Sequence, residues 1–277
     1  MSCAARLRPA LALVALAGLL AAADCWPEPG AGGNHRAVRE WTAYGGEHSA
    51  RYSSLADINP TNVDRLEVAW THRSGDFADG SGDWTYTSLQ VTPIVADDTL
   101  YYCTPFGRVF ALDPESGRER WVFDPEVRNK RSGLYPAICR GVSLWRDPAS
   151  PQAFCGRRII YGTRDAELIA LDAASGKPCA DFGNNGRVQL KEGIAGAKPW
   201  EYYPTSPPYI IGDLAVVGAA VPDNERPDVP SGVVRAFDVR SGKLVWAWEP
   251  VTDDYRRRHR DELGNTRYHL GSPNVWA

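Results

Sequence analysis

The chain has 277 residues, of which 43% are hydrophobic and 23% are charged, so it can build a core and is not a disordered polymer. Its 31 Lys and Arg against 34 Asp and Glu give a formal net charge of −3, which excludes the basic footprint of a nucleic-acid-binding protein. The 10 Trp, 12 Tyr, 26 Gly and 21 Pro favour short strands joined by tight turns over a helical bundle.

The first segment, residues 1–23, has the pattern of a secretory signal peptide. Two arginines precede an apolar run over residues 10–20, which is too short to span a bilayer, and an Ala-x-Ala-like cleavage site ends at Ala23. An uncleaved N-terminal anchor is the alternative interpretation. Residues 24–40 are rich in Pro and Gly and predict a leader or linker. The pattern therefore predicts export to the periplasm.

The informative feature of the rest is a repeat. Each copy is a short apolar strand that ends in Ala-x-Asp, followed by Ser-Gly after two intervening residues. The copies are centred on Asp113, Asp172 and Asp238, at intervals of 59 and 66 residues. Trp121 and Trp246 follow the first and third glycines by four residues, and Ala180 stands at that place in the second copy. Repeats at near-regular intervals indicate one supersecondary unit used several times.

Each copy predicts a hairpin inside a four-stranded unit. The Asp and Ser side chains can hydrogen-bond the backbone of a tight turn, in which Gly takes a positive φ. About four antiparallel strands per copy make an all-β fold, with the blade of a β-propeller as its unit. The expected strands include 92–95, 99–104, 118–123, 158–162, 179–182, 208–211, 214–221 and 243–248, with inserted loops at 124–140 and 222–231.

The two repeat tryptophans are interpreted as packing between adjacent blades, and hence as structural side chains. The blade with Ala180 must then pack on its neighbour differently.

The cysteines predict disulfides, because export leads to an oxidising compartment and the chain has no Cys-x-x-Cys pair. Cys139 and Cys155 flank a loop rich in Pro and Ser and are the preferred pair. Cys103 and Cys179 also remain in the folded part, and some of the four could be buried thiols instead.

The repeat, read as Ala-x-Asp-x-x-Ser-Gly-(Lys/Arg)-x-x-Trp, resembles the tryptophan-docking motif of dehydrogenases that use pyrroloquinoline quinone (PQQ). Residues 41–277 are similar to that family. The stretches 92–94, 139–143, 204–208 and 272–276 resemble the branch that oxidises glucose, quinate or shikimate. The resemblance implies an eight-bladed propeller with PQQ on its axis and Ca²⁺ against the PQQ oxygens. About three blades would be present here, with residues 66–73 as the outer strand of the last blade.

The resemblance also implies a set of site residues. Trp276 is expected as the stacking floor for PQQ, Arg140 as a cationic contact near its quinone oxygens, and Thr205 as a hydroxyl that bonds a PQQ carboxylate. Asp223 and Asn224 are expected as oxygen ligands of Ca²⁺. The alternatives are an ordinary salt bridge for Arg140 and a turn cap for the Asp-Asn pair.

Two positions depart from the family pattern. Gln90 stands where the branch has Glu, and Pro136 stands where it has the His that forms the ceiling over PQQ. The Pro136 ring can pack on a ring face, but its side chain cannot donate a hydrogen bond. Both departures bear on the affinity and orientation of the cofactor.

The sequence contains no counterpart of the family's catalytic Asp, which follows a His far downstream. The expected function is a periplasmic PQQ-dependent oxidoreductase that acts on CH–OH groups of sugars or cyclic polyols. A membrane quinone would be its electron acceptor, and it could associate with the inner membrane. The chain would be an N-terminal portion of it, and a second chain could complete the propeller. The alternatives are a non-catalytic scaffold for outer-membrane protein assembly and an inactive truncated fragment.

Overall fold

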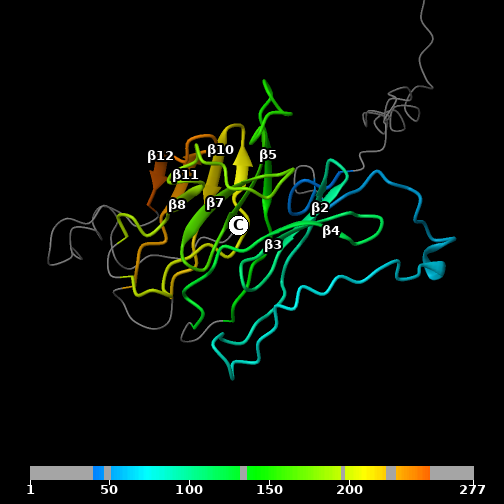
Figure 1. Ribbon diagram of the computed structural model, residues 1–277, viewed down its shortest axis with the longest axis horizontal. Coiled ribbons are helices and arrows are strands. Elements are labelled where there is room, and N and C mark those ends of the chain that lie inside the picture. Colours follow the sequence, from blue (N-terminus) through cyan, green and yellow to red (C-terminus); the bar gives the residue numbers. More distant parts are fainter. Residues whose placement is uncertain (1–39, 47–50, 132–135, 195–196, 223–228, 250–277) are drawn as a thin grey trace, which may run out of the picture. The chain divides into compact units, whose positions relative to one another are not determined.

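The computed structural model describes residues 40–46, 51–131, 136–194, 197–222 and 229–249, which all belong to one compact unit, Val38–Ala277 (Figure 1). The predicted signal peptide and all but the last residue of the predicted leader lie outside this part. In the described ranges no helix is both long and apolar enough to cross a membrane.

Twelve strands in the described residues form three antiparallel sheets, and each sheet takes its four strands in chain order. We call the sheets blades 1, 2 and 3 (Figure 1). The predicted all-β fold of four-stranded blades is therefore confirmed. Blade 1 contains β1 (Ile94–Ala96), β2 (Thr99–Cys103), β3 (Val109–Leu112) and β4 (Glu119–Phe123). Blade 2 contains β5 (Ser143–Arg146), β6 (Arg157–Gly162), β7 (Glu167–Asp172) and β8 (Arg187–Gln189), and blade 3 contains β9 (Tyr209–Ile211), β10 (Leu214–Val217), β11 (Val234–Asp238) and β12 (Leu244–Trp248). A 3-10 turn, η2 (Val63–Arg65), precedes them.

The turn after the third strand has the same geometry in all three blades, as the repeat predicts. In blade 1 the Asp113 carboxylate accepts hydrogen bonds from the backbone N–H and the hydroxyl of Ser116, at 2.9 and 2.7 Å. Gly117 then takes a φ of 70°. Bonds from the Ser116 hydroxyl and from Arg120 hold the pKa of Asp113 well below its ordinary value. The equivalent pairs are Asp172 with Ser175 and Asp238 with Ser241.

The apolar core lies between the faces of neighbouring blades. Successive side chains of a strand point to opposite faces of its sheet. In β7, Leu168 and Ala170 enter the core shared with blade 3, whereas Ile169 and Leu171 enter the core shared with blade 1.

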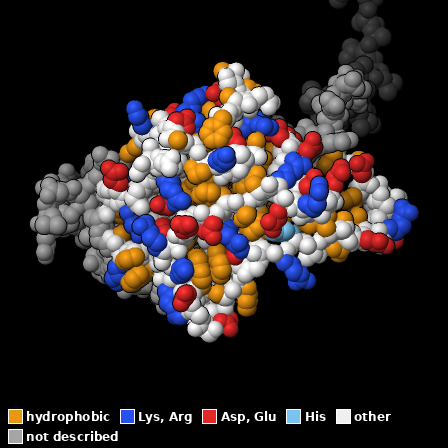
Figure 2. All heavy atoms as spheres, in the orientation of Figure 1, with side chains coloured by type: hydrophobic (Ala, Val, Ile, Leu, Met, Phe, Trp, Pro, Cys, Tyr) orange, Lys and Arg blue, Asp and Glu red, His pale blue; other side chains and the backbone are white. Residues whose placement is uncertain are grey.

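On the face shown in Figure 2, Lys and Arg side chains are interspersed with Asp and Glu, so this face presents no continuous basic surface.

Tryptophan rings join blade 1 to the segments on either side of it. The Trp121 ring lies against Gly176 of blade 2, where an added Cβ would come within 2.6 Å of it. Its Nε1–H donates to the carbonyl of Ala173 at 3.0 Å. Trp70 lies in the same way against Gly117. The structural interpretation of Trp121 is confirmed. Residues 66–73, expected as an outer strand, form no strand in the described structure, although Trp70 docks from this segment.

No tryptophan of blade 2 docks on Gly242, the receiving glycine of blade 3, as the Ala180 position predicts. Trp145 of β5 contacts blade 3 elsewhere, through its Nε1–H, which donates to the Asp213 carboxylate at 3.1 Å. The expected return strand at 179–182 is wrong. Cys179 makes one ladder bond, from its N–H to the Ala170 carbonyl, and the chain then leaves the ladder until β8. In the excursion, the Gly183 N–H donates to the Ser241 carbonyl at 2.9 Å. The Val188 side chain lies over Gly242, within 2.7 Å of an added Cβ. Backbone and a small side chain thus take the place of the ring.

The preferred disulfide Cys139–Cys155 is also wrong. The structure has Cys103–Cys139 and Cys155–Cys179, with Cα–Cα distances of 5.9 and 5.8 Å. Cys139 precedes β5 and Cys155 follows it, so the two residues lie at opposite ends of this strand. Four extended residues span about 13 Å, well beyond disulfide range. Proximity in the sequence was therefore the wrong guide to the pairing.

Candidate functional site

A cavity of about 1110 Å³ lies beside the first strands of blades 2 and 3. The first strand of each blade is an edge strand of its sheet, so its lead-in segment is available to line a cavity. Among the described residues, the lining comes from the 40–46 segment with Arg51, from the lead-in to β1 (Gln90, Thr92), from Arg140 and β5, and from the lead-in and start of β9 (residues 206–210).

Backbone hydrogen bonds bring three distant segments together at this cavity. The Thr92 N–H donates to the Arg140 carbonyl at 3.0 Å, and the Arg140 N–H donates to the Thr205 carbonyl at 3.1 Å. A bridge between Thr87 and Ala137 extends the same pairing. Arg140 is therefore held on both sides of its backbone, between the lead-ins of blades 1 and 3.

The described lining is rich in positive charge. It carries three guanidinium groups, of Arg51, Arg140 and Arg146, against one carboxylate, of Glu40. The Arg146 group lies 2.8 Å from the Glu40 carboxylate and 3.4 Å from that of Asp97. Arg51 donates to the Tyr44 hydroxyl at 3.4 Å. The hydroxyl of Ser206 and the amide of Gln90 add neutral polar groups to the wall. Such a surface favours an anionic ligand with several oxygen atoms.

The structure brings together part of the predicted site. Gln90 and Arg140 line the cavity, whereas Thr205 is buried and its neighbour Ser206 is in the lining instead. Pro136 is half-buried and is not among the described lining residues. Asp223, Asn224 and Trp276 lie outside the described residues, so their roles stay predictions.

Sequence reasoning missed two of the cationic residues. Arg51 falls inside residues 41–277, which resemble the family, but in none of the stretches that suggested a site residue. Arg146 lies on β5 without any motif, and its place at the cavity follows only from the fold.

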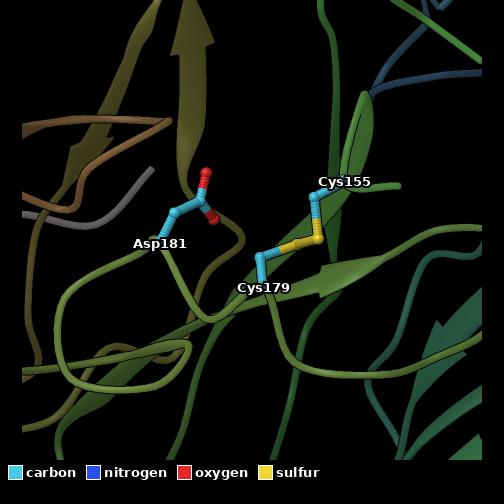
Figure 3. Close-up of side chains that lie close together, drawn as sticks. All are labelled: Cys155, Cys179 and Asp181. Carbon is cyan, nitrogen blue, oxygen red and sulfur yellow. A yellow bond between two sulfur atoms is a disulfide. The ribbon is translucent and has the colours of Figure 1, made fainter. Parts of the chain in front are cut away.

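One group of three side chains in the described ranges has metal-ligand chemistry: Cys155, Cys179 and Asp181 (Figure 3). Both sulfur atoms are bonded to each other, and the Asp181 carboxylate accepts a hydrogen bond from Arg158 at 2.5 Å. A thiolate is the form of cysteine that ligates metals, so this oxidised group is not a metal site.

These features define a tryptophan-docked β-propeller with a cationic cavity at its first strands. A family model described as "PQQ: Glucose/ethanol/alcohol dehydrogenase, beta-propeller domain" matches residues 41–277. The chain therefore belongs to this family of quinoprotein dehydrogenases.

The chain is 41% identical over 247 residues to the quinoprotein glucose dehydrogenase of Escherichia coli (strain K12), covering 87% of this chain and 30% of that protein. It is 37% identical over 232 residues to the quinate/shikimate dehydrogenase (quinone) of Acinetobacter baylyi, covering 77% and 28%. Among solved structures, the quinohemoprotein alcohol dehydrogenase from Comamonas testosteroni matches with a TM-score of 0.59 at 25% identity, covering 79% and 29%. The chain thus spans about a third of the length of these relatives.

Proposed function

We propose that this chain supplies one wall of a PQQ site in a dehydrogenase that oxidises CH–OH groups. The observation that carries the proposal is the convergence of Arg140, a residue that the resemblance implies, and Gln90, at a position that it implies, on one cationic cavity. They come from different segments, and the backbone bonds of Arg140 to Thr92 and Thr205 bring these segments together.

The described lining fits the chemistry of PQQ. PQQ is a flat ring that carries carboxylates and quinone oxygens, so it needs cations, hydrogen-bond donors and a stacking surface. Arg140 and Arg51 supply positive charge, and Ser206 and Gln90 supply donors. In this proposal Arg140 binds an oxygen of the cofactor. A hydroxyl from Thr205 rests on the resemblance alone, because Thr205 is buried and Ser206 lines the cavity in its place. When bound, PQQ supplies the two-electron acceptor for the alcohol.

The remaining roles in the proposal rest on the resemblance. Trp276 would form the stacking floor and Pro136 would pack on the opposite ring face. Asp223 and Asn224 would hold Ca²⁺, a hard cation that prefers carboxylate and amide oxygens. The metal would polarise the quinone as a Lewis acid.

Substrate, acceptor and location belong to the proposal as well. The similarity to a glucose dehydrogenase and to a quinate/shikimate dehydrogenase (quinone) supports a sugar or cyclic polyol as substrate and a membrane quinone as acceptor. The pattern of residues 1–23 supports export to the periplasm. Because the chain spans about a third of these relatives, the complete oxidation is proposed for the whole protein to which this wall belongs.

The test is a titration of the chain with PQQ and Ca²⁺, followed by tryptophan fluorescence. We expect saturable binding by the native chain. Arg140→Ala should weaken it by about tenfold or more, because a charge-assisted hydrogen bond contributes about 1.5–3 kcal/mol. Arg118→Ala is the matched control, because it removes the same charge from an exposed position in the blade 1 turn. Equal losses in both variants, or no binding by the native chain, would contradict the proposal.

A further inference from the structure

The disulfide Cys103–Cys139 is adjacent in sequence to Arg140, one of the three arginines that line the cavity. Cys103 ends β2 and is fully buried, and Cys139 precedes Arg140. Both cysteines belong to the core between blades 1 and 2. The bond therefore fixes the lead-in to blade 2 against the second strand of blade 1.

The segment that carries Arg140 is held by long-range backbone hydrogen bonds and not by a strand ladder of its own. Residues 138–142 belong to no strand, and β5 begins only at Ser143. Two backbone hydrogen bonds, with Thr92 and Thr205, hold Arg140 on either side. The disulfide closes a separation of 36 residues, which includes β3, β4 and the long connection to Arg140. Without it, the lead-in to β5 would lose its covalent link to β2 and gain conformational freedom, whereas β3 and β4 stay paired in blade 1.

We propose that the Cys103–Cys139 disulfide is a positioning element that holds Arg140 at the wall of the cavity, ready to meet an oxygen of the cofactor. The inference rests on the proposed function for its ligand and on the backbone geometry for its mechanism. Pre-organisation of a binding group strengthens binding because the ordering cost is not met when the ligand arrives.

The second disulfide provides a matched comparison within the same chain. Cys155–Cys179 closes a comparable separation of 24 residues and is equally buried, but it lies within blade 2. Neither of its cysteines lines the cavity, and neither is a sequence neighbour of a described lining residue. Removing this bond should lower stability without loosening Arg140.

The experiment compares Cys103→Ala/Cys139→Ala with Cys155→Ala/Cys179→Ala in the full chain, using two readouts. The first readout is amide hydrogen exchange at Thr92 and Arg140, whose N–H groups make the two clamping bonds, with the amides of β7 as an internal reference. We expect exchange at these two amides to accelerate by about tenfold or more in the first variant alone. The second readout is the Kd for PQQ, which should rise by about tenfold or more in the same variant.

Equal rates of amide exchange at Thr92 and Arg140 in the two variants would overturn the positioning role, whether or not the chain binds PQQ. Failure of the native chain to bind PQQ would instead overturn the proposed function, and the exchange rates would still decide whether the disulfide holds Arg140. If the first variant loses protection in β7, and so fails to fold, Cys103→Val/Cys139→Ala takes its place, because it restores buried volume without the bond.

Discussion

Two joints between neighbouring blades perform the same task with different chemistry. Blade 1 meets blade 2 through the Trp121 ring on Gly176. Blade 2 meets blade 3 through the Gly183 backbone and the Val188 side chain on Gly242. The second joint also has Arg158, whose guanidinium is almost fully buried and donates to the carbonyls of Val239 and Arg240, at 3.2 and 2.8 Å.

The comparison shows which part of the repeat the fold requires. The turn that receives the contact is the same in both joints, with an Asp–Ser pair and a Gly at a φ of about 70°. The group that docks on it differs. A bare Gly surface accepts any close-packed partner, because a missing Cβ leaves room for a ring or for backbone alike. The receiving turn is thus the invariant half of the joint.

The sharpest way to break the first joint is Trp121→Ala. The ring is half-buried against Gly176 and its N–H is bonded, so we expect a loss of about 4 kcal/mol in the free energy of unfolding. Trp246→Ala is the matched control, because Trp246 occupies the same place in blade 3 with 40% of its surface exposed. The Trp246→Ala variant should lose less than about 1 kcal/mol in the free energy of unfolding, measured by urea denaturation. Similar losses in the two variants would show that docking does not stabilise the joint.

The second joint should be weakened most by replacing Arg158. Arg158→Met leaves the carbonyls of Cys155, Val239 and Arg240 without their donor, so we expect the free energy of unfolding to fall by about 3 kcal/mol. Arg157→Met, at the neighbouring and more exposed position, breaks only an ion pair with Asp97 at 3.1 Å and should lose about 1 kcal/mol or less. Denaturation curves of both variants measure the two losses in the free energy of unfolding. A larger loss at Arg157 would contradict this account of the joint.

Gly176→Ala sharpens the comparison by separating close approach from backbone strain. The added Cβ would overlap the Trp121 ring at a φ of 71°. Gly212→Ala imposes a similar strain, at a φ of 58°, but meets nothing within 4 Å. We expect Gly176→Ala to be about 2 kcal/mol more destabilising than Gly212→Ala, which is the cost of overpacking. Equal melting temperatures would mean that the ring can move aside.

The smallest expected effect concerns the receiving turn itself. Because the pKa of Asp113 is lowered in the folded chain, its ionised carboxylate stabilises the fold above the ordinary pKa of about 3.9, and this stabilisation disappears as the pH falls through the folded value. Asp113→Asn should therefore melt below the native chain at pH 7, with a difference that shrinks below about pH 4. A difference that stays constant from pH 7 to pH 3 would show that the charge plays no part.

The sequence predicts the blades well because their information is local. The Asp, Ser and Gly of each turn act within five residues of one another, so the repeat can be read without the fold. The strand expected at 179–182 failed because Cys179 is bonded to Cys155 and the chain there turns toward blade 3. Both constraints come from residues distant in sequence.

The residues of the candidate site also differ in whether local sequence reveals them. Arg140 could be predicted because it falls within a family-like stretch, and Gln90 because it stands just before one, at a position where the branch has Glu. Arg146 could not, because a lone arginine on a strand carries no signal until the fold places it beside the 40–46 segment. The disulfides could not be assigned either, since four cysteines allow three pairings and the sequence does not show which side of β5 each one occupies.

The direction of the tryptophan contacts has a consequence for how the chain folds as it is synthesised. Each ring docks on a glycine that comes later in the sequence: Trp70 on Gly117, 47 residues on, and Trp121 on Gly176, 55 residues on. At about 5–20 residues per second, Trp70 stays unpartnered for about 2–9 s after it is made. Each of these tryptophans is therefore exposed until the glycine that it docks on has been synthesised. The blades consequently assemble in the order in which they are made.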